Sequence, residues 1–358
     1  MESQNEVFNR KFQLAVEETK NYKNTTEKYK IETEANKLFA LAVNEKNVFL
    51  QKDLYDQAII IKGNMVEAYN NRGLVKEQIG DLVGALADFD KAIDLNPSFS
   101  LAYNNRGLLK DKMGDSEGAL TDFNKAIKLN PENDLSYCNR GYLKYKTGDG
   151  DGAWADFDKA KELNPNNADV YNYRGVLKDD NGDKMGAYVD YNRAIRLKPS
   201  DADIYYNRGL LRDSMDDYTG ALNDYNEAIE LNPKLAKAYN NIAYTLFKSA
   251  KSDENLLESL KDTAIENVNT AINLDGNDYN FYATKGEIYL ALNQYHAAIA
   301  EFSHALNINN NDIESYENRS KCFRKLEERE EKEEKKAYWR AKAETDEKRV
   351  DELRRGGK

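Results

Sequence analysis

The chain has 358 residues, a formal net charge of −11 and two cysteines, Cys138 and Cys322. An acidic chain of this kind argues against a surface that neutralises nucleic-acid phosphates or anionic lipid, so we expect neither a nucleic-acid nor a membrane partner. Two cysteines far apart in the sequence argue against a disulfide framework and for a reducing compartment. The N-terminus, MESQNEVFNRK, lacks a signal-peptide pattern, and no apolar run approaches membrane-spanning length. We therefore expect a cytoplasmic protein.

Residues 1–31 are expected to form a capping helix. A short apolar stripe at helical spacing consists of Phe8, Phe12, Ala15 and Val16. The run Asn24-Thr25-Thr26 offers a helix N-cap before Glu27. Such a helix would pack on the repeated region that follows and cover its open end. The alternative is an amphipathic helix that binds a partner.

Residues 32–312 contain about eight copies of a 34-residue unit. One clear copy includes Ala102–Pro131, AYNNRGLLKDKMGDSEGALTDFNKAIKLNP, and we number positions so that its proline is position 32; all 5 prolines of the chain fall there. Close copies fill residues 66–235. The first copy, 32–65, is degenerate and lacks both the position-8 glycine and the proline. The copy at 236–278 carries about nine extra residues near 252–259, where we expect the turn between two helices.

Each unit has the pattern of an antiparallel pair of helices. In the copy quoted above, the first helix is expected to end near Gly114, because glycine tolerates the left-handed geometry that closes a helix. The second helix carries an apolar stripe at spacings of three and four, made of Ala119, Leu120, Phe123, Ala126 and Ile127. Gly107 and Ala119 are small where larger residues would hold the two helices apart. The apolar face of one pair is too large for itself, so each pair must stack on a neighbour.

Residues 313–358 are expected to form a C-terminal capping helix with a charged extension. No second helix of the unit follows the first-helix pattern that returns at Ser315, Tyr316, Asn318 and Arg319. We expect this helix to continue into Glu327–Arg355, where opposite charges three and four residues apart support a solvated helix. Trp339, Val350 and Leu353 leave a second interpretation, a coiled-coil or docking helix.

The unit resembles the tetratricopeptide repeat (TPR) family. The resemblance rests on Tyr103, Gly107, Ala119, Phe123, Ala126 and Pro131, at positions 4, 8, 20, 24, 27 and 32. It implies an all-α fold, a right-handed TPR solenoid of helix-turn-helix units. It also implies that the first helices line a concave channel into which positions 2, 5, 6, 9, 12 and 13 point.

The chain departs from the family at positions 7 and 11, which are usually apolar. Five copies carry arginine at position 7 and aspartate at position 23: Arg72 and Asp88, Arg106 and Asp122, Arg140 and Asp156, Arg174 and Asp190, and Arg208 and Asp224. Position 11 is also basic in these copies. In the copy at 236–278 the three charges disappear together, as Ile242, Leu246 and Asn267. We infer that the position-7 base pairs with the position-23 acid, because a partly buried guanidinium without a partner would be costly.

Asparagines dominate the two channel positions 5 and 6. Position 6 holds Asn71, Asn105, Asn139, Tyr173, Asn207 and Asn241, and position 5 adds Asn70, Asn104, Asn172 and Asn240. An asparagine amide offers one acceptor group and two N–H donors, so it can hold a peptide group at both its N–H and its C=O. A ladder of such amides predicts a site for an extended peptide. The alternative is that these asparagines join neighbouring repeats and bind nothing.

An acidic column is expected beside this ladder at position 12, where Asp111, Asp179 and Asp213 stand. A basic or polar extended segment is therefore the expected ligand, in preference to an acidic tail or RNA. One branch of the family holds a carboxylate terminus with lysine or arginine at positions 2, 5 and 6. That clamp is absent here, since those positions hold residues such as Leu101 and Asn104.

Catalysis finds little support in the sequence. His296 and His304 are eight residues apart, which is not the spacing of a metal pair, and no nucleophile motif or phosphate-binding glycine loop is present. We expect no enzyme activity, no metal and no cofactor. The predicted function is a non-enzymatic scaffold for protein–protein interaction that binds an extended polar or basic peptide. The alternative is a structural protein that self-associates through its ends or its charged C-terminal helix.

Overall fold

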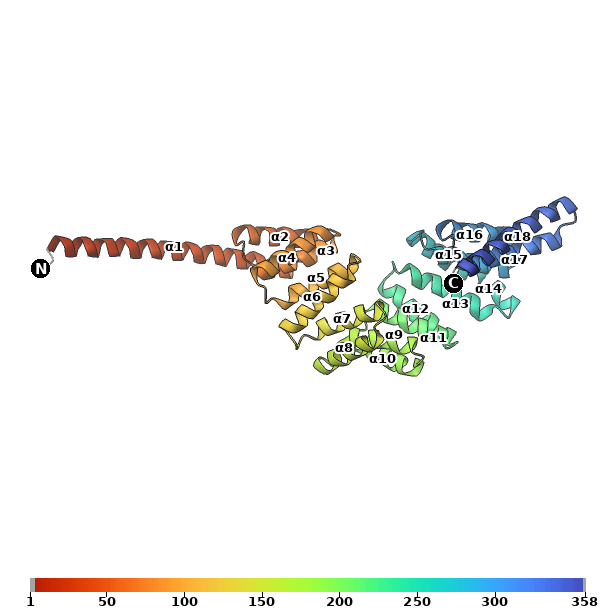
Figure 1. The fold of residues 1–358 in the computed structure, drawn as a ribbon, viewed down its shortest axis with the longest axis horizontal. Helices are drawn as coiled ribbons and strands as arrows, with labels where there is room; N and C mark the ends of the chain where they lie inside the picture. Colours follow the sequence, from red (N-terminus) through yellow and green to blue (C-terminus); the bar gives the residue numbers. More distant parts are fainter. Residues whose placement is uncertain (1–3, 357–358) are drawn as a thin grey trace. The chain divides into compact units, whose positions relative to one another are not determined.

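The structure, a computed structural model, describes residues 4–356, with side chains described for Glu17 and from Thr25 onward. In this range it contains 18 helices and no strand (Figure 1). The helices pack in consecutive pairs that follow the repeat, so the expected all-α solenoid of stacked helix pairs is confirmed. The chain divides into two compact units, residues 1–167 and 168–358. None of the helices in the described range is long and apolar enough to cross a membrane.

The first unit contains four helix pairs. Its helices are α1 (Gln4–Asn44), α2 (Val48–Ile61), α3 (Val66–Gln78), α4 (Leu82–Leu95), α5 (Ser100–Lys112), α6 (Ser116–Leu129), α7 (Asp134–Lys146) and α8 (Gly150–Leu163). The first helices of successive repeats pack on one another, α3 on α5 and α5 on α7, whereas no second helices do so to a comparable extent in the described residues. The first helices therefore line the inner face of this unit.

The second unit contains five helix pairs. Its helices are α9 (Ala168–Asp180), α10 (Lys184–Leu197), α11 (Ala202–Ser214), α12 (Tyr218–Leu231), α13 (Ala236–Ala250), α14 (Glu254–Leu274), α15 (Tyr279–Ala291), α16 (Tyr295–Ile308), α17 (Ile313–Arg329) and α18 (Glu333–Gly356). First helices again touch, α9 with α11, α13 with α15, and α15 with α17. They form the inner face of the second unit.

In four repeats the turn between the two helices is built by a Gly-Asp pair, Gly80-Asp81, Gly114-Asp115, Gly148-Asp149 and Gly182-Asp183. Gly114 has a φ of +88°, the left-handed conformation expected at the helix end. The carboxylate of Asp115 then accepts a hydrogen bond from the backbone N–H of Gly118 (2.9 Å) and caps α6. The same cap recurs at Asp81, Asp149, Asp183 and Asp217. The periodic Gly-Asp pairs are therefore turns and caps.

Close approach of the two helices depends on the position-8 glycine. The ring of Phe123, which is 1 % exposed, lies over Gly107. A Cβ atom at residue 107 would lie 2.8 Å from the Cε1 atom of this ring, closer than side chains approach. The same relation holds between Gly73 and Phe89, where the distance would be 2.6 Å. The small residue singled out in the sequence therefore sets the helix spacing.

The inferred pairing of positions 7 and 23 is confirmed. Arg106 donates through Nε and Nη2 to the two carboxylate oxygens of Asp122 (2.8 and 2.6 Å), and that carboxylate is 3 % exposed. Lys110, at position 11, lies 2.8 Å from the same carboxylate. Bidentate, charge-assisted bonds of this kind are among the stronger hydrogen bonds in proteins. Equivalent pairs join Arg72 to Asp88, Arg140 to Asp156, Arg208 to Asp224 and Lys285 to Glu301.

Each of these arginines also reaches the preceding repeat, a contact that was not predicted. Arg106 Nη1 donates to Asp90 Oδ1 (2.6 Å) on α4. Arginines of other repeats make the same bond: Arg72 to Asp56, Arg140 to Asn124, and Arg208 to Asn192. One guanidinium thus joins three helices. We call Arg106 with Asp122, Lys110 and Asp90, and the equivalent groups elsewhere, the arginine clamp.

The C-terminal segment differs from the expected single helix. α17 ends at Arg329, α18 begins at Glu333, and the two pack as a helix pair. Arg319 donates to both carboxylate oxygens of Asp346 (2.8 and 2.7 Å), so α18 supplies the acid of a terminal arginine clamp. The prediction of a first helix without a second, continued by a solvated extension, is therefore wrong. In this last pair the arginine and the aspartate are 27 residues apart, against 16 in the other repeats. That longer spacing hides the pair from a 34-residue pattern.

The extra residues in the copy at 236–278 lengthen its helices and leave the turn short. α14 has 21 residues and α13 has 15, against 14 and 13 in α6 and α5. Asp253 accepts from the backbone N–H groups of Asn255 and Leu256 and caps α14. The expectation of a longer turn is therefore corrected, since residues 254–259 belong to α14.

The N-terminal helix is continuous. α1 runs without a break from Gln4 to Asn44, so the N-cap expected at Asn24-Thr25-Thr26 is not used. Its last turns pair with α2, and Ala35 and Ala42 join Tyr55 in one apolar cluster. The side chains of the stripe Phe8, Phe12, Ala15 and Val16 lie outside those described. Capping of the array by residues 1–31 therefore stays a prediction.

Replacement of Asp122 by asparagine is expected to destabilise the first unit by about 3 kcal/mol, because Arg106 and Lys110 would remain half-buried beside a neutral group. Chemical unfolding of the intact chain measures this loss. The control Asp94→Asn makes the same change at an exposed position and should have little effect. If the losses of Arg106→Gln and Asp122→Asn simply add, with no coupling, the two residues do not stabilise each other.

Gly107→Ala is expected to destabilise the α5–α6 pair by about 1–3 kcal/mol, since the new methyl group meets the Phe123 ring. Adding Phe123→Leu should recover part of the loss by making room. Because each repeat touches only its neighbours, amide hydrogen exchange should accelerate in α3–α8 and stay slow in α15 and α16. Equal acceleration along the chain would show that the array unfolds as one unit.

Candidate functional site

The asparagines of positions 5 and 6 form a hydrogen-bonded chain along the inner face of the first unit. Between repeats, Asn105 Nδ2 donates to Asn70 Oδ1 (2.9 Å) and Asn139 Nδ2 donates to Asn104 Oδ1 (3.0 Å). Within repeats, Asn70 Nδ2 donates to Asn71 Oδ1 (3.1 Å) and Asn104 Nδ2 donates to Asn105 Oδ1 (3.4 Å). The predicted ladder is thus linked from one repeat to the next.

The second unit carries a shorter version of this chain. Asn207 Nδ2 donates to Asn172 Oδ1 (3.0 Å), and Asn241 Nδ2 donates to Tyr206 Oη (3.2 Å). Tyr206 occupies position 5, where four other copies have asparagine and the copy that contains Asn139 has Cys138. Tyr173, at position 6, is half-buried.

Burial separates the two positions. The position-5 residues are at most 8 % exposed: Asn70, Asn104, Asn172 and Asn240. The position-6 residues are half-buried: Asn71, Asn105, Asn139, Tyr173, Asn207 and Asn241. The bonds between repeats use one N–H of each position-6 amide, as the bracing alternative expects, and an amide has a second N–H to offer. Peptide binding by the position-6 asparagines stays a prediction.

Three of the four position-12 acids are paired with lysines of the next repeat. Glu77, in the first unit, lies 3.0 Å from Lys112. Asp111 lies 2.9 Å from Lys146 in the first unit, and Asp213 lies 3.1 Å from Lys248 in the second. All three lysines stand at position 13. The inner face is therefore less acidic at Asp111 and Asp213 than position 12 alone suggests.

Asp179 differs from the other three acids. The next repeat has Ser214 at position 13, and no described side chain donates a hydrogen bond to its carboxylate. Burial raises the pKa of Asp179, Lys184 opposes this effect and Asp180 adds to it. The Asp179 carboxylate therefore lies on the inner face of the second unit without the lysine partner that the other position-12 acids have.

A cavity of about 450 Å³ opens between α13, α15 and α17 on the inner face of the second unit. Its polar wall includes Asn240, Asn241, Thr284, Glu287, Ser315 and Asn318, and its aromatic wall includes Tyr206, Tyr244, Tyr279 and Phe281. This volume is typical of pockets that bind small molecules or single side chains. No histidine or cysteine lies in the wall, whose ionisable side chains are carboxylates, tyrosines and one lysine.

Two buried polar atoms of this wall have no hydrogen-bond partner in the described structure, Asn240 Oδ1 and Ser315 Oγ. Asn240 is 8 % exposed and Ser315 is fully buried. An unpaired buried polar atom costs about 1–3 kcal/mol, so such atoms call for a physical explanation.

The repeat at 279–312 explains both unpaired atoms. Elsewhere, the position-5 amide oxygen accepts from the next position-6 asparagine, but the copy after Asn240 has Thr284 at position 6. In the first unit the position-3 hydroxyl of Ser136 donates to the preceding position-5 asparagine, Asn104 (3.1 Å). Ser315 is the equivalent serine, and the residue that precedes it at position 5 is Ala283. One repeat without the two asparagines thus interrupts the chain of bonds and leaves its acceptors facing a cavity.

Glu287 is the principal charged group of the cavity. Burial raises its pKa to about 7, and the neighbouring Glu314 adds to this shift, while Lys251 and Lys321 oppose it and Asp312 adds slightly. Glu287 stands at position 9, which the family resemblance directs into the channel. Neither Glu287 nor Ser315 was predicted as a site residue. The substitution of asparagine by alanine and threonine at positions 283 and 284 is the sequence signal that would have found them.

The described part of the chain contains no cluster of side chains that could hold a metal ion. No three side chains of histidine, cysteine, aspartate and glutamate come together there as ligands. Cys138 and Cys322 are both buried. Burial raises the pKa of Cys322 to about 12, which keeps it protonated and unreactive at neutral pH.

Glu287→Gln is expected to stabilise the second unit at pH 8 and to have little effect at pH 4. A carboxyl whose pKa rises from 4.5 to about 7 on folding holds its proton more tightly in the folded chain, so stability declines as pH rises through that window. Glutamine removes this decline, roughly 1–3 kcal/mol above pH 7. Thermal unfolding at both pH values measures it.

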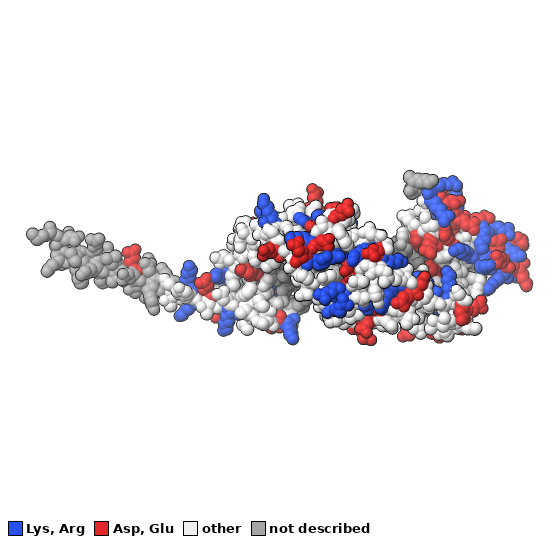
Figure 2. Space-filling view, turned by 90° about the horizontal axis from the view of Figure 1, so that it is seen from below, with Lys and Arg blue, Asp and Glu red and all other residues white. Residues whose placement is uncertain are grey.

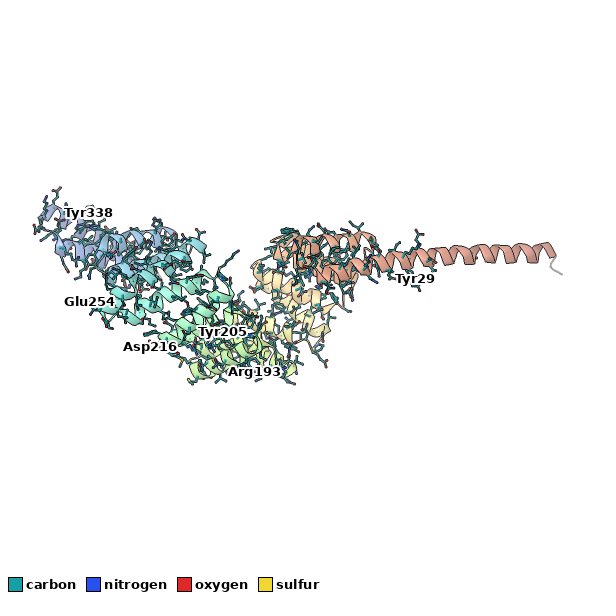
Figure 3. The ribbon with its side chains drawn as sticks, turned by 180° about the vertical axis from the view of Figure 1, so that it is seen from behind. Tyr29, Arg193, Tyr205, Asp216, Glu254 and Tyr338 are labelled. Atoms are coloured by element: carbon teal, nitrogen blue, oxygen red, sulfur yellow. The ribbon has the colours of Figure 1, made fainter. Side chains whose placement is uncertain are left out.

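The matched control is Glu254→Gln, which removes a charge from the exposed start of α14, outside the cavity wall (Figure 3). It should leave the difference between pH 4 and pH 8 unchanged. A stabilisation by Glu287→Gln of equal size at both pH values would contradict the raised pKa.

Family models for the tetratricopeptide repeat match a large part of the chain. Two models described as "Tetratricopeptide repeat" match residues 66–99, 100–133 and 202–235, and residues 135–167 and 279–312. A third, described as "TPR repeat", matches residues 180–212. No curated protein sequence matches the chain.

Solved structures share the fold. The crystal structure of the APC/C hetero-tetramer Cut9-Hcn1 is similar over 77 % of this chain and 52 % of that one, with 17 % identity and a TM-score of 0.65. This chain therefore spans about half the length of that relative, and the likeness concerns the fold alone.

Two further structures match more loosely. A tetratricopeptide repeat protein from Parabacteroides merdae matches over 81 % of this chain and 99 % of its own, with 19 % identity and a TM-score of 0.46. YrrB, described as a TPR protein with an unusual peptide-binding site, matches over 51 % and 95 %, with 24 % identity and a TM-score of 0.37. Since the three sets of family-model matches together cover more than half of the sequence, this chain belongs to the tetratricopeptide repeat family.

Proposed function

We propose that the chain is a protein-interaction scaffold that holds an extended polar or basic segment of a partner against the inner faces of its units. The cavity of the second unit carries this proposal, because its unpaired acceptors are of the kind that a bound peptide satisfies. Repeat arrays use their concave surfaces for binding, and the first helices supply that surface here.

The composition of the inner face supports a peptide ligand. Half-buried asparagines offer amide groups to a main chain. Partly exposed leucines at positions 2 and 9 accompany them: Leu74, Leu101, Leu108, Leu135 and Leu210. Such a face provides hydrogen bonds for peptide groups and apolar contacts for side chains. Asp179, Glu287 and Glu314 favour a ligand of positive charge.

Self-association through the C-terminal helix has less support. α18 uses its apolar face within the chain, where Ala343 and Val350 are buried and the ring of Trp339 stacks on Phe323 at 5.9 Å. On the face seen in Figure 2, acidic and basic residues are interspersed and dense at the end that α17 and α18 form. A solvated surface of this kind lacks the apolar patch that a stable interface needs.

The proposed function is tested with a displayed library of random twelve-residue peptides selected on the intact chain. Enriched peptides should carry more lysine and arginine than aspartate and glutamate. Leu108→Arg combined with Leu210→Arg should weaken them about tenfold or more, since the new charges occupy the inner faces and repel a basic ligand.

The control is Val83→Arg, which places the same charge on a second helix at a side chain 75 % exposed. It should leave binding unchanged. Peptides that tolerate the inner-face changes but lose affinity with Val83→Arg would move the site off the first helices and end the proposal.

A further inference from the structure

We propose that the cavity between α13, α15 and α17 is a pocket for a positive charge on the bound segment, supplied by a lysine, an arginine or a free N-terminal amine. This inference rests on the proposed function and names the group that the second unit selects. Three independent features of the cavity support it: its unpaired acceptors, its carboxylates and its aromatic wall.

The unpaired atoms call for a donor. Asn240 Oδ1 can only accept, and Ser315 Oγ can accept as well as donate. They come from α13 and α17, the helices that pack on either side of α15, so the cavity offers acceptors to a bound segment on both sides of α15. An ammonium group has three N–H donors and no acceptor, and a guanidinium has five. A neutral amide would satisfy the same oxygens but would leave the neighbouring carboxylates without a counter-charge.

The carboxylates call for a cation. Glu287 lies in the wall with Glu314 near enough to disfavour its ionisation. The one basic residue in the wall is Lys237, whose side chain is exposed. Burial, and then the charge of Glu287, raise the pKa of the hydroxyl of Tyr244, which also lines the cavity. The wall of the cavity therefore carries more carboxylates than basic side chains.

The aromatic wall suits the stem of a basic side chain. Tyr206, Tyr244 and Phe281 present ring surface to the cavity. A lysine or arginine side chain carries an apolar stem that packs on such surface, and a cation near a ring face gains further attraction. The volume of about 450 Å³ holds one such side chain and part of the adjoining backbone.

The first unit has no counterpart of this pocket among its described residues. There Asn70 and Asn104 have their amide oxygens paired, and position 9 holds Leu74 and Leu108. The same repeat positions thus form a closed chain of amides in one unit and an open acidic pocket in the other. The pocket fixes where along an extended ligand the basic residue must lie.

Two kinds of probe test the pocket on the intact chain. The first is n-butylammonium chloride, a mimic of the lysine side chain. The second is a set of fluorescent peptides, acetyl-Asn-Ser-X-Ser-Asn-amide, in which X is lysine, arginine or norleucine, with an unacetylated norleucine peptide to supply a free amine. Titration calorimetry and fluorescence anisotropy measure binding. Lysine, arginine or the free amine should bind at least tenfold more tightly than acetylated norleucine.

Two variants assign this binding to the cavity. Glu287→Gln should remove the preference for the cation, and Ser315→Ala should weaken it severalfold. Glu254→Gln should leave it intact. Between pH 8 and pH 6 the affinity of n-butylammonium and of the lysine and arginine peptides should fall about fivefold to tenfold as Glu287 takes up a proton, and Glu287→Gln should abolish this dependence.

The outcomes separate this inference from the proposed function. Equal affinity for lysine and acetylated norleucine overturns the charge pocket, and so does a cation preference that survives Glu287→Gln. The proposed function then still stands if library peptides remain sensitive to Leu108→Arg and Leu210→Arg. If no probe binds, n-butylammonium included, the pocket is overturned, and the library selection decides the function independently.

Discussion

The arginine clamp is the interaction on which the rest of the structure depends. A bare stack of apolar helix pairs would tolerate small rotations between repeats, since apolar contact has little directional preference. The guanidinium of Arg106 has a fixed planar geometry, and it bonds Asp122 in its own repeat and Asp90 in the one before. Each clamp therefore fixes both the angle within a pair and the step between pairs. The inner face inherits its regular spacing from this constraint.

The asparagines of the inner face hydrogen-bond one repeat to the next, and the cavity lies where this series of bonds is interrupted. Asn105 and Asn139 bond backwards to Asn70 and Asn104, which completes the buried amides of the first unit. At Ala283 and Thr284 the series lacks its partners, and two buried atoms remain unpaired. The clamp also lapses nearby, since Ile242 and Leu246 replace its basic residues. Both polar networks thus change at the repeats that line the cavity.

The fold could be predicted well from the sequence because the same helix-pair pattern recurs in successive copies of the repeat. Glycine at position 8, the Gly-Asp turns and the matched loss of charge at Ile242 and Asn267 each gave a local physical reason for a helix pair. The misses fall where the period is broken. The spacing between Arg319 and Asp346 exceeds that of the other pairs, so α18 looked like a solvated tail. The cavity depends on which partners are missing between repeats, and absence of a partner becomes visible only when distances are known.

The regular spacing of the clamps allows such a chain to gain or lose whole repeats over evolutionary time. Arg106 bonds residues sixteen positions away on both sides, and the whole pattern recurs every 34 residues. Duplication or loss of one whole repeat, by recombination between copies, therefore leaves every remaining clamp with its partners. A duplicated copy of 279–312 would carry Ala283 and Thr284 with it and open a second gap in the asparagine series. If the proposed pocket binds a basic residue, the spacing of such residues along the ligand would lengthen in whole repeat steps while the packing of the core is retained.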